Sequence, residues 1–151
     1  MRLRKFNKLG VAEVASIVFI LAIESVVLSV SVYGISTTLE SRVERLGELQ
    51  AQNGVNSVAD ALIDAAITAQ LFPTLTFTKI VEVPEQIGGR PYYFTINKER
   101  IYANSTDGAI SINSTTYGVK DLDIIVYGKA YVYTGRVSVE YSNNEIVIEE
   151  A

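Results

Sequence analysis

The sequence predicts an α+β fold, with a long N-terminal apolar α-helix, a short second helix and a C-terminal antiparallel β domain. Three observations lead to this fold class. Residues 11–35 are almost all apolar or small, apolar residues keep a helical spacing to about Gln50 and again over residues 58–71, and from Thr74 onward apolar and polar residues alternate. Beyond the apolar segment, the 151-residue chain has room for one compact domain.

The apolar segment, residues 11–35, is long enough to cross a bilayer as a helix, which takes about 20 residues. A basic cluster directly precedes it. The positive-inside rule therefore places residues 1–10 in the cytoplasm and the chain after Tyr33 outside. A secretory signal fits less well, because its apolar core is only about 7–15 residues long.

Two stripes run along this predicted helix. At about 100° per residue, Glu13 and Glu24 fall within about 20° of each other on one face. The opposite face carries a small residue at every seventh position, with Ser25 beside it: Ala15, Ala22, Ser29 and Ser36. Small residues let helices approach closely in lipid, and an ionisable group inside a bilayer is rare unless it faces protein. The stripes favour assembly with identical helices; the alternative is a lone anchor with a protonated Glu24 and serines bonded to their own helix.

The basic leader, Gly10 and the run VAEVASIVFILAIESVVLSVSVYG resemble the N-terminus of archaeal type IV pilins, whose precursors carry a class III signal peptide. The resemblance implies that a prepilin peptidase cuts after Gly10. Val11 would then be the new N-terminus and Glu13 the third residue of the mature chain. The family prefers a charged residue directly before the glycine, where this sequence has Leu9.

The resemblance also implies a function. We expect a structural subunit of an archaeal type IV pilus-like cell-surface filament, which polymerises through its N-terminal helix and serves adhesion or surface attachment. Its partners would be other copies of itself, the prepilin peptidase, the pilus assembly ATPase and platform protein, and the membrane before assembly. The alternatives are a single-span membrane-anchored binding module facing outward and a minor pilin-like component of a secretion or uptake machine.

After the apolar segment, the helical spacing continues to about Gln50. Asn53-Gly54 predicts a break or a kink, and the second helix is expected over residues 58–71, ending before Pro73. The predicted regions are the basic leader (1–10), the first helix (11–50), the second helix and its connection (51–72) and the extracellular β domain (73–151).

The β domain is predicted from short β-branched and aromatic runs that are separated by turn residues. In the last hairpin Val137, Val139 and Tyr141 alternate with polar residues, so one face should be buried. The turn Asn143-Asn144 suits residues that tolerate positive φ.

Two features of the β domain are candidate sites. Tyr127, Tyr131 and Tyr133 share a strand face with Lys129 between them, which suggests either a sugar-stacking or subunit contact surface or ordinary half-buried tyrosines. Asn104 and Asn113 each begin an Asn-x-Ser/Thr sequon, which predicts N-linked glycans on the part expected outside.

Composition excludes several other functions. The chain has no cysteine and no histidine, which excludes disulfides, thiol chemistry, imidazole catalysis and the usual zinc sites. Its formal net charge is −4, and its only basic cluster lies in residues 2–8, so nothing favours nucleic acid as a partner. No nucleophile–base pair, phosphate loop or metal cluster can be assembled. We therefore expect no enzyme, no cofactor and no metal site.

Overall fold

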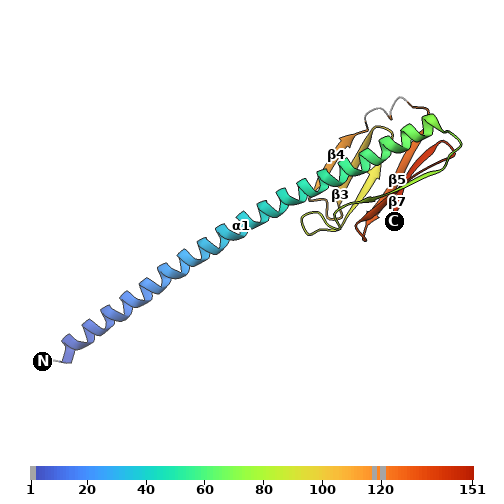
Figure 1. The fold of residues 1–151 in the computed structure, drawn as a ribbon. Helices are drawn as coiled ribbons and strands as arrows, with labels where there is room; N and C mark the ends of the chain where they lie inside the picture. The colour runs from blue at the N-terminus through green and yellow to red at the C-terminus, as the bar shows by residue number, and fades with distance from the viewer. Residues whose placement is uncertain (1–2, 117–118, 120–121) are drawn as a thin grey trace. The chain divides into compact units, whose positions relative to one another are not determined.

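The structure, a computed structural model, describes residues 3–116, 119 and 122–151, with side chains from residue 13 onward. It divides into two compact units, residues 1–41 and 42–151. An apolar helix and a mostly antiparallel sheet confirm the predicted α+β class (Figure 1). The elements are α1 (Leu3–Leu71), β1 (Phe77–Glu82), β2 (Tyr92–Ile96), β3 (Arg100–Ser105), β4 (Ser111–Thr115), β5 (Ile125–Val132), β6 (Arg136–Ser142) and β7 (Glu145–Glu150).

The predicted break at Asn53-Gly54 is wrong, because α1 runs without interruption to Leu71 and there is no separate second helix over 58–71. Gly54 lies where the helix meets the sheet: a Cβ on it would be 3.1 Å from Cζ of Phe94. A glycine costs a helix about 1 kcal/mol relative to alanine. Burial of the neighbouring Val55 and Val58 against the sheet offsets that cost. The predicted end before Pro73 is confirmed.

The sheet has seven strands in the order β1-β6-β7-β5-β2-β3-β4. Every neighbouring pair is antiparallel except β5 and β7, which are parallel. The predicted antiparallel domain is therefore correct apart from this pair. The exception arises because the β6–β7 hairpin lies between β1 and β5, so that β7 meets β5 in the same direction.

The β6–β7 hairpin agrees with the prediction from its sequence. Asn143 and Asn144 have φ values of 50° and 70°, and the strands on either side pair from Ser142 with Glu145 onward. Two residues with positive φ match the right-handed twist of the strands they join. The turn residues thus fix the register that places Val139 in the core.

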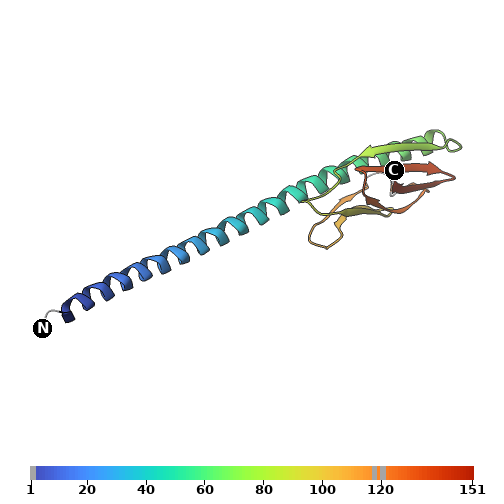
Figure 2. The ribbon, with the colours of Figure 1, turned by 90° about the horizontal axis from the view of Figure 1, so that it is seen from below.

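Residues 42–71 of α1 lie along one face of the sheet, and in the described part of the chain no helix covers the other face (Figures 1 and 2). We call the covered face the inner face and the other the outer face. The helix contributes mostly small side chains to the core, among them the fully buried Ala51, Ala61 and Ala65. The strands contribute the larger ones, including Tyr92, Phe94 and the predicted Val137, Val139 and Tyr141.

The first buried turn of the helix touches the loop between β1 and β2. Gln50 Oε1 accepts a hydrogen bond from the backbone N–H of Gly88 at 3.0 Å. A Cβ on Gly47 would lie 2.8 Å from that same nitrogen and closer still to the Ile110 side chain. Gly88 itself has a φ of +57°, a conformation that L side chains rarely adopt. Two glycines therefore let helix and loop approach each other.

We expect Gly47→Ala to destabilise residues 42–151 by about 1–3 kcal/mol, because the added methyl overpacks the contact with Gly88. The higher helix propensity of alanine, about 1 kcal/mol, acts in the opposite direction. Thermal unfolding of the full chain in detergent, followed by circular dichroism of the sheet, measures the effect. Gly34→Ala, which meets nothing within 4 Å, is the matched control and should not lower the melting temperature. Equal melting of both variants would contradict the packing argument.

Candidate functional site: the apolar helix and the outer sheet face

The apolar part of α1 is long and apolar enough to cross a membrane, with a mean hydropathy of 2.3 in its most apolar window. None of that window is buried within the chain. Large side chains such as Phe19, Leu28 and Val30 each expose more than 60% of their surface. An apolar surface of this extent needs lipid or other protein around it.

The predicted assembly residues all lie on this helix and all are exposed: Glu13, Ala15, Ala22, Glu24, Ser25, Ser29 and Ser36. Ser25 donates a hydrogen bond to the backbone oxygen of Leu21 and Ser29 to that of Ser25, each at 2.8 Å. These bonds use the hydroxyl protons within the helix, but each hydroxyl oxygen can still accept. Gly10 and Val11 lie within α1, before the first residue whose side chain the structure describes.

A cluster of aromatic rings lies on the outer face of the sheet. We define the tyrosine cluster as Tyr93, Tyr131 and Tyr133 with Lys129. Tyr93 on β2 stands directly opposite Tyr131 on β5, with ring centroids 5.3 Å apart, and Tyr131 stacks on Tyr133 at 5.9 Å and 12°. Lys129 Nζ lies 4.1 Å from the Tyr93 centroid and 4.8 Å from that of Tyr131, a cation–π geometry.

The structure brings together two of the three tyrosines that sequence reasoning singled out, and it adds one that this reasoning missed. Tyr127 shares the outer face, but its hydroxyl donates to Glu145 Oε2 at 3.0 Å. This hydrogen bond, together with the charge of Glu145, raises the pKa of Tyr127. Tyr93 was missed although the alternation in PYYFTI separates it from the buried Tyr92 and Phe94. Only the strand order shows that β2 lies beside β5.

Both sequon asparagines lie on the outer face, at the β3–β4 end of the sheet. Asn104 on β3 stands opposite Tyr93 on one side and Ser111 on the other. The Ser111 hydroxyl donates to Asn104 Oδ1 at 2.7 Å. Asn113 on β4 is exposed and stands opposite Tyr102. The two asparagines are thus on a surface that a sugar could occupy without displacing the core.

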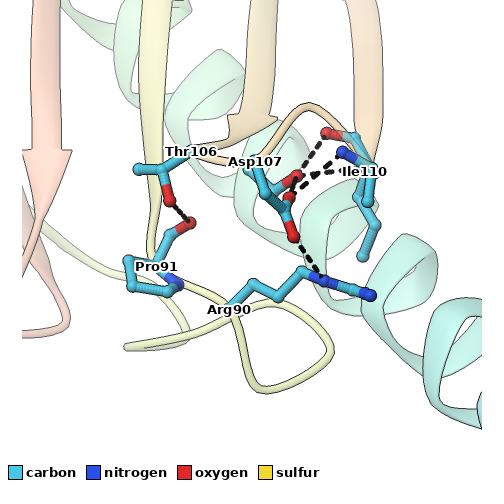
Figure 3. A network of polar contacts seen from close by, with 7 residues as sticks. Arg90, Pro91, Thr106, Asp107 and Ile110 are labelled. Atoms are coloured by element: carbon cyan, nitrogen blue, oxygen red, sulfur yellow. Dashed lines mark hydrogen bonds and ion pairs between the residues drawn. The ribbon is translucent and has the colours of Figure 1, made fainter.

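A polar network holds the turn that follows Asn104 (Figure 3). Asp107 Oδ2 forms an ion pair with Arg90 Nε at 2.7 Å, and its Oδ1 accepts from the Ser105 hydroxyl at 2.6 Å and the Ala109 backbone N–H at 3.1 Å. The Ser105 hydroxyl oxygen in turn accepts from the Ile110 N–H at 2.9 Å. These partners, Ser105 above all, lower the pKa of Asp107.

Two acids on the helix, Asp60 and Asp64, are exposed, and Asp64 forms an ion pair with Lys79 of β1 at 2.6 Å. Exposed pairs of this kind contribute little to stability, about 0–1 kcal/mol. Among residues 3–116, 119 and 122–151, no group of three or more acidic side chains is arranged to hold a metal ion.

Comparison of the chain with models of known protein families, with curated proteins and with solved structures gives no match. The likeness to archaeal type IV pilins therefore depends on the N-terminal residues and on the observed architecture. A long apolar helix followed by a mostly antiparallel sheet is compatible with a pilin-like fold.

We expect Asp107 to titrate below the ordinary value of 3.8, and Ser105→Ala and Arg90→Gln each to move the midpoint upward. Because the folded pKa is lowered, the ionised carboxylate stabilises the turn at neutral pH, and this stabilisation is lost as the pH falls through the folded pKa. Carboxyl ¹³C chemical shifts of the full chain measure the midpoint. Arg136→Gln removes the same charge from an exposed position at the start of β6 and is the control. A midpoint that is unchanged in the Ser105 and Arg90 variants would contradict the assignment.

Proposed function

We propose that the chain is the structural subunit of an archaeal type IV pilus-like cell-surface filament that polymerises through its N-terminal helix. The observation that carries the proposal is the apolar part of α1, whose described residues are all exposed and which combines membrane-spanning length with a stripe of small residues and a stripe of acids. The sheet unit would be displayed outside the cell, where it serves adhesion or surface attachment. Before assembly, the apolar helix would hold the precursor in the membrane with its N-terminus in the cytoplasm.

The two acids are the main physical reason to prefer a polymer over a permanent anchor. A carboxylate at the centre of a bilayer costs on the order of 3 kcal/mol, and such residues almost always face protein or water. Glu13 and Glu24 have no hydrogen-bond or ion-pair partner within the described residues, so a neighbouring subunit can supply one. The free amine of Val11, exposed by peptidase cleavage after Gly10, is a suitable partner for Glu13 because a buried charge needs an opposite one.

The small stripe supplies the contact surface for such a polymer. In lipid there is no hydrophobic driving force between helices, so close packing over small residues stabilises the pair instead. Ala15 and Ala22 leave room for a second backbone, and Ser29 and Ser36 offer hydroxyl oxygens as acceptors. Cleavage after Gly10 would also remove four basic residues and no acidic one, changing the formal net charge from −4 to −8.

The rival function is a single-span anchor for an outward-facing binding module. The internal hydrogen bonds of Ser25 and Ser29 favour it, because they satisfy the hydroxyl protons without a second helix. A minor pilin-like component of a secretion or uptake machine is a third candidate, which would be processed by the same peptidase but would be scarce in filaments. The prepilin peptidase, assembly ATPase and platform protein are partners only of the two pilin-like candidates.

We expect the protein purified from its native cells to begin at Val11. Prepilin peptidase cleavage after Gly10 removes the basic leader and leaves the apolar helix intact. Intact mass and N-terminal peptide mapping measure this, on membranes and on sheared surface filaments separately. Gly10→Leu, which blocks the cut site, is the processing control. A native protein that retains residues 1–10 would support the plain anchor instead.

We expect Ala22→Leu to reduce the yield of surface filaments at least tenfold, because the added volume separates helices that pack over the small stripe. Electron microscopy and the amount of subunit in sheared filaments measure the yield. Ile23→Phe adds volume at the same depth but off both stripes, and it is the matched control. Equal yields from the two variants, with equal membrane levels of precursor, would refute the packing surface.

A further inference from the structure

The outer face of the sheet places aromatic rings directly beside a glycosylation sequon. We propose that Asn104 carries an N-linked oligosaccharide and that this oligosaccharide packs on the tyrosine cluster of the same chain. The occupant of the uncovered face is thus a sugar chain that the protein itself holds. The proposal rests on the outward orientation given under the proposed function, because it needs residues 42–151 to meet the glycosylation machinery.

The strand register supplies the geometry. Asn104 and Tyr93 are direct cross-strand partners, and so are Tyr93 and Tyr131. Side chains of direct partners point to the same face, with Cβ atoms about 4.5–5.5 Å apart. Strands lie about 4.8 Å apart, so Tyr131 is roughly 10 Å from Asn104 across the sheet. The first sugar on Asn104 therefore lies beside the Tyr93 ring, and the next sugars reach Tyr131 and Tyr133.

The side-chain amide of Asn104 can accept a sugar without a change in the fold. The Ser111 hydroxyl holds its Oδ1, whereas its Nδ2, the atom that bonds to sugar, has no hydrogen-bond partner among the described residues. A sugar on Nδ2 therefore breaks no hydrogen bond of the fold. The third sequon residue, Thr106, is exposed and donates from its hydroxyl to Pro91 O at 3.3 Å (Figure 3). The network around Asp107 fixes the turn that follows the sequon, and the hydrogen bond from Ser111 orients the Asn104 amide.

The chemistry of the cluster suits a sugar better than a protein strand. A tyrosine offers an apolar ring face and a polar edge, which match the C–H face and the hydroxyl groups of a pyranose. Tyr133 and Tyr131 expose 66% and 37% of their surface, although they stack on each other. Lys129 Nζ lies over the rings of both Tyr93 and Tyr131. A covalently attached sugar covers these rings without the translational entropy that a free ligand loses.

Asn113 provides an internal comparison. It begins the second sequon, lies on the same face and has one tyrosine, Tyr102, as its direct partner. Within the described residues, Tyr102 makes no ring contact of the kind that joins Tyr93, Tyr131 and Tyr133. A sugar on Asn113 would therefore meet a single ring, and its removal should leave the cluster unaffected.

The experiment uses full-length protein purified from its native host, with glycopeptide masses at Asn104 and nitration of each tyrosine by tetranitromethane. We expect Asn104 to carry sugar, and Asn104→Gln to raise the nitration rates of Tyr131 and Tyr133 roughly fivefold. Thr106→Val, which removes the sequon but keeps Asn104, should give the same increase. Tyr127, tied to Glu145 on the same face, should react equally in all variants and reports that the sheet is intact.

Asn113→Gln is the matched control and should leave the rates of Tyr131 and Tyr133 unchanged. An unmodified Asn104 in the native protein would overturn the proposal, and so would equal nitration with and without the sugar. Protection that persists in Asn104→Gln would assign the cluster to a free oligosaccharide or a second copy. These outcomes are independent of the proposed function, because a chain that keeps residues 1–10 and forms no filament can still carry a protecting sugar on Asn104.

Discussion

The packing of residues 51–69 of α1 on the inner face is the constraint on which the sheet unit depends. A single sheet cannot bury its own apolar face and needs a second layer. The helix supplies that layer with small side chains, Ala51, Ala61 and Ala65 among them, so its backbone lies close to the strands. The large strand residues Tyr92 and Phe94 fill the space that the alanines leave, and each buried ring contributes roughly 2–3 kcal/mol.

This packing also explains why one helix can serve two environments. In residues 51–69 the buried positions recur with helical spacing, as for a helix on a sheet, and the remaining ones are polar or half-buried except for the exposed Ile63 and Ile67. In residues 13–41 every described position is exposed, and large apolar residues occupy all sides between the two stripes. Residues 51–69 thus pack against the sheet of the same chain, whereas residues 13–41 need lipid or other chains around them.

Much of this could be predicted from the sequence where local chemistry decides the structure. The turn at Asn143-Asn144 is expected to adopt positive φ, and Val137, Val139 and Tyr141 are expected to form a buried face. Both predictions are confirmed. The predictions failed where distant residues decide. From the sequence, Gly54 predicts a helix break, but in the structure it lies within α1 at the contact with Phe94. The partnership of Tyr93 with Asn104 and Tyr131 depends on strand order, which alternation alone does not contain.

The composition of the outer face also follows from the packing of α1 on the inner face. Because α1 satisfies the inner face, the outer side chains are free of any packing requirement, and most of β6 and β7 carries serine or glutamate there. On β2 and β5, tyrosines occupy outer-face positions instead. Their rings expose apolar surface to solvent, although the outer face has no second layer to pack against. The sugar proposed on Asn104 would cover these rings and keep this face of the sheet from packing against other proteins.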